Sequence, residues 1–292
     1  MDFVVGIDGG GTSCRAAVAD GRGTILAQAK SGSANIRTDL EGAYKNIMAA
    51  VADCASQVGT GVDELKRGVA VLGLAGGNVG NYSARLKTLL GFRESIIVND
   101  GIIAMHGALG SHDGVIGIVG TGSVFVARSH GTIRSIGGWG FQVGDLGGGA
   151  RLGRQLLEET LLAHDGATPK SPLTEQVMAM FEGDPRKIVD QVRDATPGFY
   201  GSFAPMIVEA AATKDPVANG LLDQGCHDVE RMLQAIMSPD TDRICLLGGL
   251  AAAYSARIGE SFRTHLKPPL GDALQGAVTM AAAHVSRIPA DG

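Results

Sequence analysis

The sequence predicts an α/β protein built from two similar domains, and two observations lead to this expectation. First, apolar stretches of strand length alternate with helical stretches along the chain, which indicates a largely parallel sheet covered by helices. Second, the stretch from Val115 onward repeats the glycine spacing of the first strand. A duplicated unit of this size predicts two domains that face each other. We place the first domain at residues 1–109 and the second at 110–292, with a helical insertion at about 150–240.

The composition argues against several classes of partner. The chain has 292 residues, 45% of them hydrophobic, and its net charge of −5 comes without any run rich in Lys and Arg. Nucleic acid and anionic membranes are therefore not expected partners. No apolar stretch has the length of a membrane span, and no basic segment or cleavage site precedes the first strand. Four scattered cysteines predict reduced core thiols. The expected compartment is the cytoplasm.

The first strand ends on a carboxylate that is followed at once by glycines. Phe3 to Thr12 reads F-V-V-G-I-D-G-G-G-T, and Cys14 to Ala19 predicts a second strand. Backbone N–H groups of successive glycines can bind an anion, and Asp8 is well placed to hold Mg²⁺ through water. Neither a P-loop nor a dinucleotide motif follows. The hairpin is therefore either a nucleotide-phosphate site or a glycine-rich turn without a ligand. Its candidate phosphate-binding residues are Gly9, Gly10, Gly11, Thr12 and Ser13.

The second half of the chain opens with the same pattern. Gly6, Ile7, Gly9, Gly11 and Thr12 correspond in order, at one constant offset, to Gly117, Ile118, Gly120, Gly122 and Ser123. Asp8 corresponds to Val119, so only the first half offers a metal-binding carboxylate. Two such hairpins would grip a polyphosphate from opposite sides, which favours the phosphate interpretation. The candidate residues of the second hairpin are Thr121, Gly122 and Ser123.

The other elements of the first half follow from apolar periodicity. Leu40 to Val58 carries apolar residues at helical spacing, and further helices are expected at 81–90 and 102–109. Apolar runs predict strands at 24–29, 69–74 and 95–98. Ligands of such sheets lie at the carboxyl ends of strands. Asp8 and Asp100 stand at such ends and are therefore candidate site residues.

The second half is expected to be mainly helical after a glycine-rich loop. Residues 137–153 contain eight glycines besides Trp139 and Asp145, so this segment is a candidate binding loop. Trp139 either packs against a sugar or anchors the loop in the core. Asp145 either accepts hydrogen bonds from a polyol or shapes the turn. Prolines interrupt the helices of 150–237, a strand is expected at 243–247, and helices are expected from about Tyr254 and at 272–285.

Two glycines follow the strand at 243–247. Gly248 and Gly249 either allow the backbone to approach a flat ligand such as adenine or form a tight structural turn.

The two glycine hairpins, Asp100 and the pair Gly248 and Gly249 resemble the phosphate-binding, catalytic and adenosine-binding segments of the actin/hexokinase/Hsp70 ATPase superfamily. Within it, the chain resembles the BadF-type ATPase family and its amino-sugar kinases. The resemblance extends over nearly the whole chain, and five short motifs in the right order make it specific. The stretches most similar to the glucosamine kinases are 9–16, 31–36, 200–205, 243–250 and 272–277.

The resemblance implies two ribonuclease-H-like (actin-like ATPase) domains with a cleft that closes on ATP and sugar. It implies that Asp100 is the general base, although an Asp before Gly101 also suits a helix N-cap. The two hairpins would hold the triphosphate of Mg²⁺-bound ATP, and Gly248 and Gly249 would contact adenosine. The residues that would face the sugar are Asn35, Asp100, Gly138, Trp139 and Asp145.

The implied activity is transfer of the γ-phosphoryl group of ATP to the 6-hydroxyl of glucosamine. N-acetylglucosamine is the alternative acceptor. Kinases of that sugar in this family carry Gly-Asp-Glu-Gly-Ser after the Trp loop, whereas this chain has Gly-Asp-Leu-Gly-Gly at 144–148. Two rival classes are an activator ATPase with an iron–sulfur cluster, for which no cysteine pattern stands out, and a non-catalytic sugar sensor. Dimers are common among relatives, so the sequence leaves open a homodimer as well as a monomer.

Overall fold

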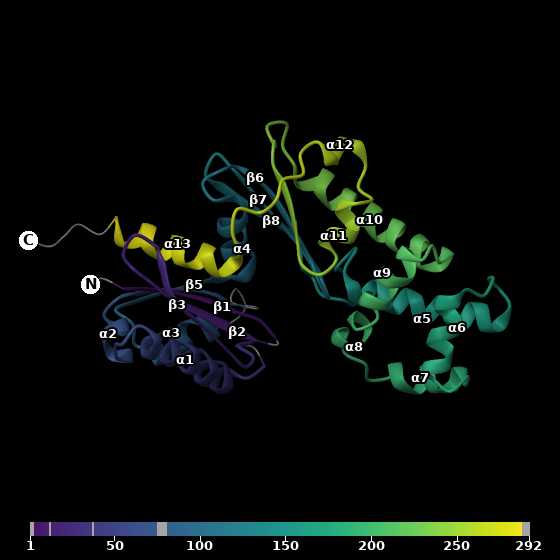
Figure 1. Cartoon of the computed structure of the whole chain (residues 1–292), viewed down its shortest axis with the longest axis horizontal. Helices are drawn as coiled ribbons and strands as arrows, with labels where there is room; N and C mark the ends of the chain where they lie inside the picture. The colour runs from purple at the N-terminus through teal and green to yellow at the C-terminus, as the bar shows by residue number, and fades with distance from the viewer. Residues whose placement is uncertain (1–2, 12, 37, 75–80, 288–292) are drawn as a thin grey trace, which may run out of the picture. The chain divides into compact units, whose positions relative to one another are not determined.

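The chain folds into two compact units. The computed structural model describes residues 3–11, 13–36, 38–74 and 81–287 (Figure 1). Residues 1–112 and 269–292 form the first unit, and residues 113–268 form the second. The closing helix, which the sequence boundaries assigned to the second domain, therefore lies in the first unit. Each unit contains one mixed sheet with helices packed on it, as expected for an α/β protein.

The sheet of the first unit has the strand order β3-β2-β1-β4-β5. β1 pairs antiparallel with β2, and β2 pairs antiparallel with β3, whereas β1, β4 and β5 run parallel. The sheet is thus half parallel rather than largely parallel, because three consecutive strands at its start form a meander. The strands are β1 Val4–Gly9, β2 Cys14–Ala19, β3 Ile25–Ser31, β4 Val69–Leu74 and β5 Glu94–Asn99.

The register of the parallel strands brings two carboxylates to one edge. Asp8 pairs with Gly73 on β4, and Leu74 pairs with Asn99 at the end of β5. Asp100 follows Asn99 directly as the first residue of the next helix. Since neighbouring strands lie about 4.8 Å apart, β1 and β5 are separated by roughly 10 Å. The fold therefore places Asp8 and Asp100 at the same carboxyl edge.

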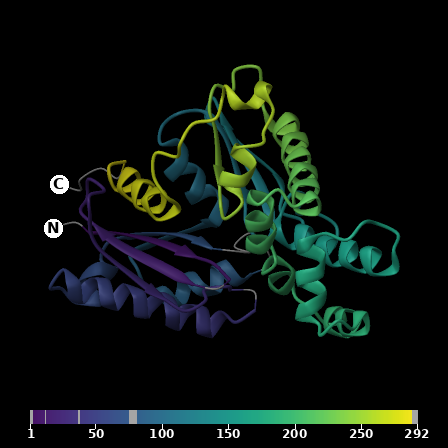
Figure 2. The same cartoon turned by 45° about the vertical axis from the view of Figure 1, so that its right-hand side comes forward.

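Helices cover both faces of this sheet (Figures 1 and 2). The strand residues pack into two separate cores. Ile7 packs in a core with residues of α1, whereas Val4 packs in a separate core with Ile103 and Val278. α4 and α13 approach so closely that a Cβ on Gly276 would overlap the carbonyl of Ile103. The helices are α1 Leu40–Gln57, α2 Val62–Lys66, α3 Tyr82–Leu90, α4 Asp100–Leu109 and α13 Ala273–Val285.

The second unit repeats the meander of the first. Its sheet has the order β8-β7-β6-β9, with β6 antiparallel to β7 and parallel to β9. This is the arrangement of β2-β1-β4 in the first unit, so the repeat found in the sequence corresponds to a repeat of structure. The strands are β6 Gly114–Val119, β7 Ser123–Ser129, β8 Thr132–Gly137 and β9 Ile244–Leu247.

Prolines begin many of the helices of the second unit. Pro172, Pro185, Pro197 and Pro216 each stand at the first helical position, where the missing N–H has no partner to lose. The prolines that interrupt the sequence pattern therefore mark helix starts. The helices are α5 Gly149–Asp165, α6 Pro172–Met180, α7 Pro185–Val192, α8 Pro197–Gly201, α9 Ala204–Ala212, α10 Pro216–Ile236, α11 Ala251–Ser255 and α12 Glu260–Arg263.

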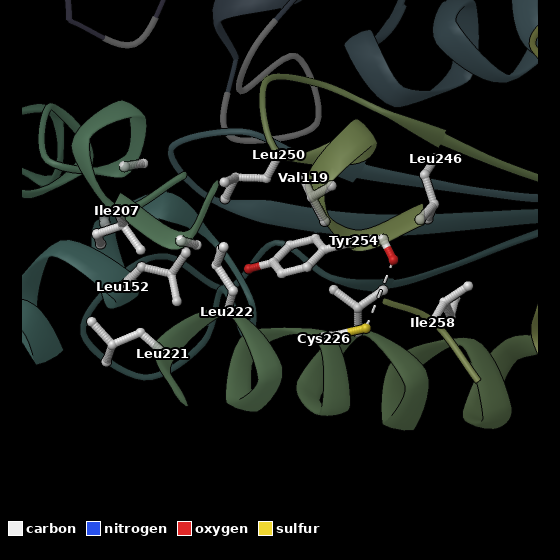
Figure 3. Packing of buried hydrophobic residues seen from close by; sticks show 14 of the residues in the cluster. Val119, Leu152, Ile207, Leu221, Leu222, Cys226, Leu246, Leu250, Tyr254 and Ile258 are labelled. Carbon is white, nitrogen blue, oxygen red and sulfur yellow. Dashed lines mark hydrogen bonds between the residues drawn. The ribbon is translucent and has the colours of Figure 1, made fainter. Parts of the chain in front are cut away.

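Tyr254 is the largest fully buried side chain of the second unit's core (Figure 3). It lies among aliphatic side chains that include Leu152 and Leu222, above Cys226 on α10. Its hydroxyl donates to the carbonyl oxygen of Gly147 at 2.6 Å. Burial raises the pKa of this phenol, so it remains a donor. The core thus anchors the glycine-rich loop through one hydrogen bond.

The four cysteines are free and buried, as the sequence predicts. Burial raises the pKa of Cys14 to about 12 and that of Cys54 to about 11. None of the helices in the described part of the chain is long and apolar enough to cross a membrane.

Candidate functional site

The hairpin between β1 and β2 is held by its own backbone. The N–H of Gly10 donates to the carbonyl oxygen of Ser13 at 2.9 Å, so this donor is used inside the turn. A Cβ on Gly9 would lie 2.5 Å from Leu74 Cδ2, whereas one on Gly11 would meet nothing within 4 Å. Gly9 therefore serves packing, and the open tip at Gly11 is the part that can approach a phosphate. Thr12 lies outside the described residues.

Asp8 is bound by an arginine from the neighbouring strand. Arg15 Nη2 and Nε lie 2.7 and 3.2 Å from Asp8 Oδ2, and Arg15 Nη1 lies 2.6 Å from Asp272 Oδ2. Burial alone would lower the pKa of Arg15, but the hydrogen bonds to both carboxylates outweigh it and raise the pKa. Asp272 also accepts the N–H of Gln275 as the N-cap of α13. One guanidinium thus fixes the Asp8 carboxylate and ties β1 to the closing helix.

Asp100 begins α4 but is not its N-cap. Asn99 is the N-cap, and its side chain accepts the N–H of Gly101 at 2.9 Å. Asp100 Oδ1 lies 3.0 Å from the same N–H. Burial raises the pKa of Asp100, and the negative charge of Asp8 raises it further. A partly buried carboxylate with a raised pKa is suited to accept a proton, and the neighbouring Asn99 already performs the capping role.

Asn35 lies in a short loop after β3 that contacts the first hairpin. The N–H of Ala34 donates to the carbonyl oxygen of Gly10 at 3.0 Å. Ala34 and Ile36, on either side of Asn35, are fully buried. The first unit therefore brings together Asp8, the hairpin, Asp100 and the backbone that carries Asn35.

In the second unit the β6–β7 hairpin contacts the glycine-rich loop. A Cβ on Gly122 would overlap the carboxylate of Asp145, so only glycine permits this contact. Asp145 has a left-handed backbone, with φ of 55°, and its Oδ1 accepts the N–H of Gly140 at 3.2 Å. Its carbonyl oxygen accepts the N–H of Gly148 at 2.9 Å. Asp145 therefore does shape the turn, and its carboxylate lies beside the second hairpin.

Ser123 forms hydrogen bonds to the same glycine-rich loop. It is 6% exposed, and its hydroxyl donates to the carbonyl oxygen of Leu146 at 2.7 Å. Its carbonyl oxygen accepts the N–H of Gly138 at 2.9 Å. In this structure Ser123 holds the loop against the hairpin, and its expected contact with phosphate stays a prediction.

Trp139 does not anchor the loop in the core. Its side chain is 78% exposed, and that of Val143 is 83% exposed. Of the two interpretations of Trp139, burial is thus wrong. An exposed indole on a loop fixed at Gly138 and Asp145 is suited to pack against the apolar face of a sugar.

Gly248 and Gly249 have different surroundings. Gly248 has φ of +95°, and a Cβ there would lie 2.5 Å from the carbonyl oxygen of Val119, so this glycine makes a tight structural turn. Gly249 has nothing within 4 Å of its Cβ position. It lines a mostly apolar cavity of about 590 Å³ together with residues of the β6–β7 hairpin and α9. The cavity is lined by Gly120, Thr121, Gly201, Ala204, Pro205, Val208, Glu209, Gly249 and Leu250.

This cavity is large enough for a nucleoside and has the mostly apolar lining of a small-ligand site. Pockets for small ligands are mostly apolar and range from about 300 to 1,000 Å³. It lies between the second hairpin and the glycine that follows β9, two of the segments that the sequence predicts for nucleotide binding. A second cavity of about 570 Å³, between α5 and α10, contains none of the predicted site residues.

Sequence reasoning missed several residues that the structure adds to these sites. Pro205 and Val208 line the nucleoside-sized cavity because they share one face of α9 at helical spacing. The sequence signal for Pro205 is its place in the stretch 200–205, which resembles the glucosamine kinases, whereas Val208 lies outside that stretch. Arg15 and Asp272 are far apart in sequence and are joined only by the fold.

The folds and the glycine hairpins of both units define an ATPase of the duplicated-domain type. The chain belongs to the BadF/BadG/BcrA/BcrD ATPase family, whose model matches residues 5–285.

Three known proteins are similar over nearly the full length. Glucosamine kinase GspK of Vibrio cholerae is 35% identical over 293 residues, which cover 100% of both chains. A structure from Chromobacterium violaceum, provisionally assigned as an N-acetylglucosamine kinase, has a TM-score of 0.88 and 30% identity and covers 96% of this chain and 99% of its own. A ROK family glucokinase from Streptomyces griseus, solved with glucose and AMPPNP, shares the fold with a TM-score of 0.58 and 20% identity, covering 96% and 99% of the two chains.

Proposed function

We propose that this protein transfers the γ-phosphoryl group of ATP to the 6-hydroxyl of glucosamine. The cavity lined by Thr121 and Gly249 supports this proposal most directly, because adenosine bound there would lie beside the hairpin that we expect to bind phosphate. The full-length similarity to a glucosamine kinase supports an amino sugar as the acceptor. N-acetylglucosamine is the second candidate, supported by Trp139 and by the relative from Chromobacterium violaceum.

Phosphoryl transfer needs positioning and charge stabilisation more than covalent chemistry. Under this proposal, Asp100 accepts the proton of the attacking hydroxyl, and its raised pKa suits it to that role. Backbone N–H groups at the tips of the two hairpins, near Gly11 and Gly122, bind the phosphates. The cavity holds adenosine, and Asn35, Gly138, Trp139 and Asp145 contact the sugar.

Asp8 fits a role in holding Mg²⁺ that arrives with ATP. Within the described residues, no group of three or more His, Cys, Asp or Glu side chains is arranged to hold a metal by itself. Mg²⁺ is commonly bound by one or two carboxylates together with substrate phosphates and water. Both hydrogen bonds from Arg15 to Asp8 end on Oδ2, so under this proposal Oδ1 is the oxygen that faces the hydrated ion. The ion would neutralise charge on the transferred group.

An activator ATPase is the rival from another class. Its cluster requires cysteine thiolates, whereas burial raises the pKa of Cys226 to about 11 and also raises that of Cys245. Buried thiols that stay protonated are poor cluster ligands. The chemistry of these cysteines therefore favours the kinase.

A coupled assay of ADP release with a panel of free sugars tests the proposal. The panel contains glucosamine, N-acetylglucosamine, glucose and mannose, and each product is analysed for its site of phosphorylation. We expect glucosamine to give the highest kcat/KM, with phosphate on the 6-position. A higher kcat/KM for N-acetylglucosamine would support the second candidate, and no stimulation by any sugar would overturn the kinase assignment.

Filling the cavity is expected to weaken ATP binding selectively. Val208 lines the cavity from α9, and Val208→Trp would occupy the space of the base. We expect KM for ATP to rise roughly tenfold or more, with KM for the sugar changed by less than about twofold. Val189→Trp, at an apolar position of α7 that is already 56% exposed, is the control. Equal KM values for ATP in the two variants would show that adenosine binds elsewhere.

A further inference from the structure

The loop that carries Asn35 is tied to the middle of α1. We call residues 31–35, which leave β3, the acceptor loop. The side-chain amide of Asn46 donates from Nδ2 to the carbonyl oxygen of Ser33 at 2.7 Å. The hydroxyl of Ser31 donates to the backbone carbonyl oxygen of Asn46, also at 2.7 Å. One residue of α1 thus contacts the start and the middle of the acceptor loop.

The far end of the acceptor loop is joined to the phosphate hairpin. Ala34 donates its N–H to Gly10 at 3.0 Å, and the N–H of Asn35 lies 3.4 Å from the hydroxyl of Ser33. The carbonyl oxygen of Asn35 accepts the N–H of Asp39, the N-cap of α1, at 3.2 Å. The backbone on both sides of Asn35 is therefore held, and Asn46 supplies the side-chain contact on the Ser33 side.

The amide of Asn46 lies against Gly32. A Cβ on Gly32 would lie 2.8 Å from Asn46 Nδ2, so the glycine makes room for the amide. A carboxylate in place of the amide would point an oxygen at the Ser33 carbonyl and lose the donor. Glycine at 32 and an amide donor at 46 therefore depend on each other.

We propose that Asn46 is a positioning residue that fixes the acceptor loop so that Asn35 is held ready for the sugar. This inference rests on the proposed function, because it assigns Asn35 to the acceptor. Asn46 contacts the loop backbone and not the reacting atoms, so its effect is on sugar binding rather than on the chemical step. The bond between Ala34 and Gly10 is independent of Asn46, so ATP binding is expected to be retained.

Asn46→Ala and the nearly isosteric Asn46→Asp remove the donor, and Gly32→Ala displaces it. Gln57→Ala is the matched control, because Gln57 Nε2 also ties α1 to backbone, at the carbonyl of Gln28, 3.0 Å away and outside the acceptor loop. For the three loop variants we expect KM for glucosamine to rise roughly tenfold, with kcat and KM for ATP within about twofold of wild type. Gln57→Ala should keep the wild-type KM.

Amide hydrogen exchange of the sugar-free protein gives a second readout that needs no activity. We expect exchange in the peptide covering residues 31–39 to be at least about fivefold faster in Asn46→Ala and unchanged in Gln57→Ala. Equal exchange in both variants, or a KM for sugar unchanged in Asn46→Ala, would overturn the role of Asn46. If wild-type protein shows no sugar-dependent ADP release, the proposed function fails instead, and the exchange result alone decides whether Asn46 fixes the loop.

Discussion

Asp100→Asn is expected to lower kcat for sugar phosphorylation roughly 10²- to 10⁴-fold, the usual contribution of a general base. Asparagine keeps the shape of the side chain but cannot accept the hydroxyl proton. ATP binding should change little, because the nucleoside-sized cavity and Asp100 belong to different units. Steady-state kinetics together with calorimetric titration of ATP measures both quantities.

The same prediction has a pH signature. Burial and the charge of Asp8 raise the pKa of Asp100, and a general base must be deprotonated to act. Activity of the wild type should therefore fall as the pH is lowered through this pKa, with the acid limb above the ordinary Asp value of about 3.9. Asp100→Asn should lose this limb. Asp39→Asn, which replaces the N-cap of α1 with another good cap, is the control. A wild-type kcat in Asp100→Asn would show that Asp100 is not the general base.

Asp8→Asn is expected to reduce kcat roughly 10²-fold or more at millimolar Mg²⁺. Loss of the carboxylate weakens the hold on the hydrated ion, and metal stabilisation of a phosphoryl transition state is worth several kcal/mol. The amide oxygen can still accept a hydrogen bond from Arg15, so the fold should be retained. A titration of activity against Mg²⁺ should show that the variant needs a higher concentration of the ion.

The control for this variant is Asp20→Asn, an acid on a turn of the same sheet that accepts the N–H groups of Arg22 and Thr24. Its kcat and Mg²⁺ requirement should match those of the wild type. An unchanged Mg²⁺ requirement in Asp8→Asn would show that the ion is held without Asp8.

Local patterns in the sequence predicted most of the elements. The first two strands, the helix from Leu40 and the strand at 69–74 all lie within a few residues of the expected positions. These elements are predictable because the apolar spacing of a strand or a helix involves only residues that are close together in the sequence. The constant offset between Gly6 and Gly117 likewise anticipated two sheets of related topology. The sequence does not predict β8, since most of its residues are exposed and carry no apolar alternation.

The parts that could not be predicted depend on contacts between distant residues. Nothing local indicates that Arg15 bridges Asp8 and Asp272, or that Gly248 is constrained by Val119 whereas Gly249 faces a cavity. Trp139 illustrates the same limit. A lone tryptophan among glycines suits both a buried anchor and an exposed platform, and only the packed structure distinguishes them.

The closing helix has a consequence for the order in which the protein assembles during synthesis. The closing helix contributes Leu274 and Val278 to the core that also contains Val4 of β1. The first unit therefore still lacks these core side chains after all of its strands have left the ribosome. The second unit is continuous from Asp113 to Pro268, so all of it has been synthesised before the closing helix. The half of the molecule that is translated first is therefore the half that is finished last.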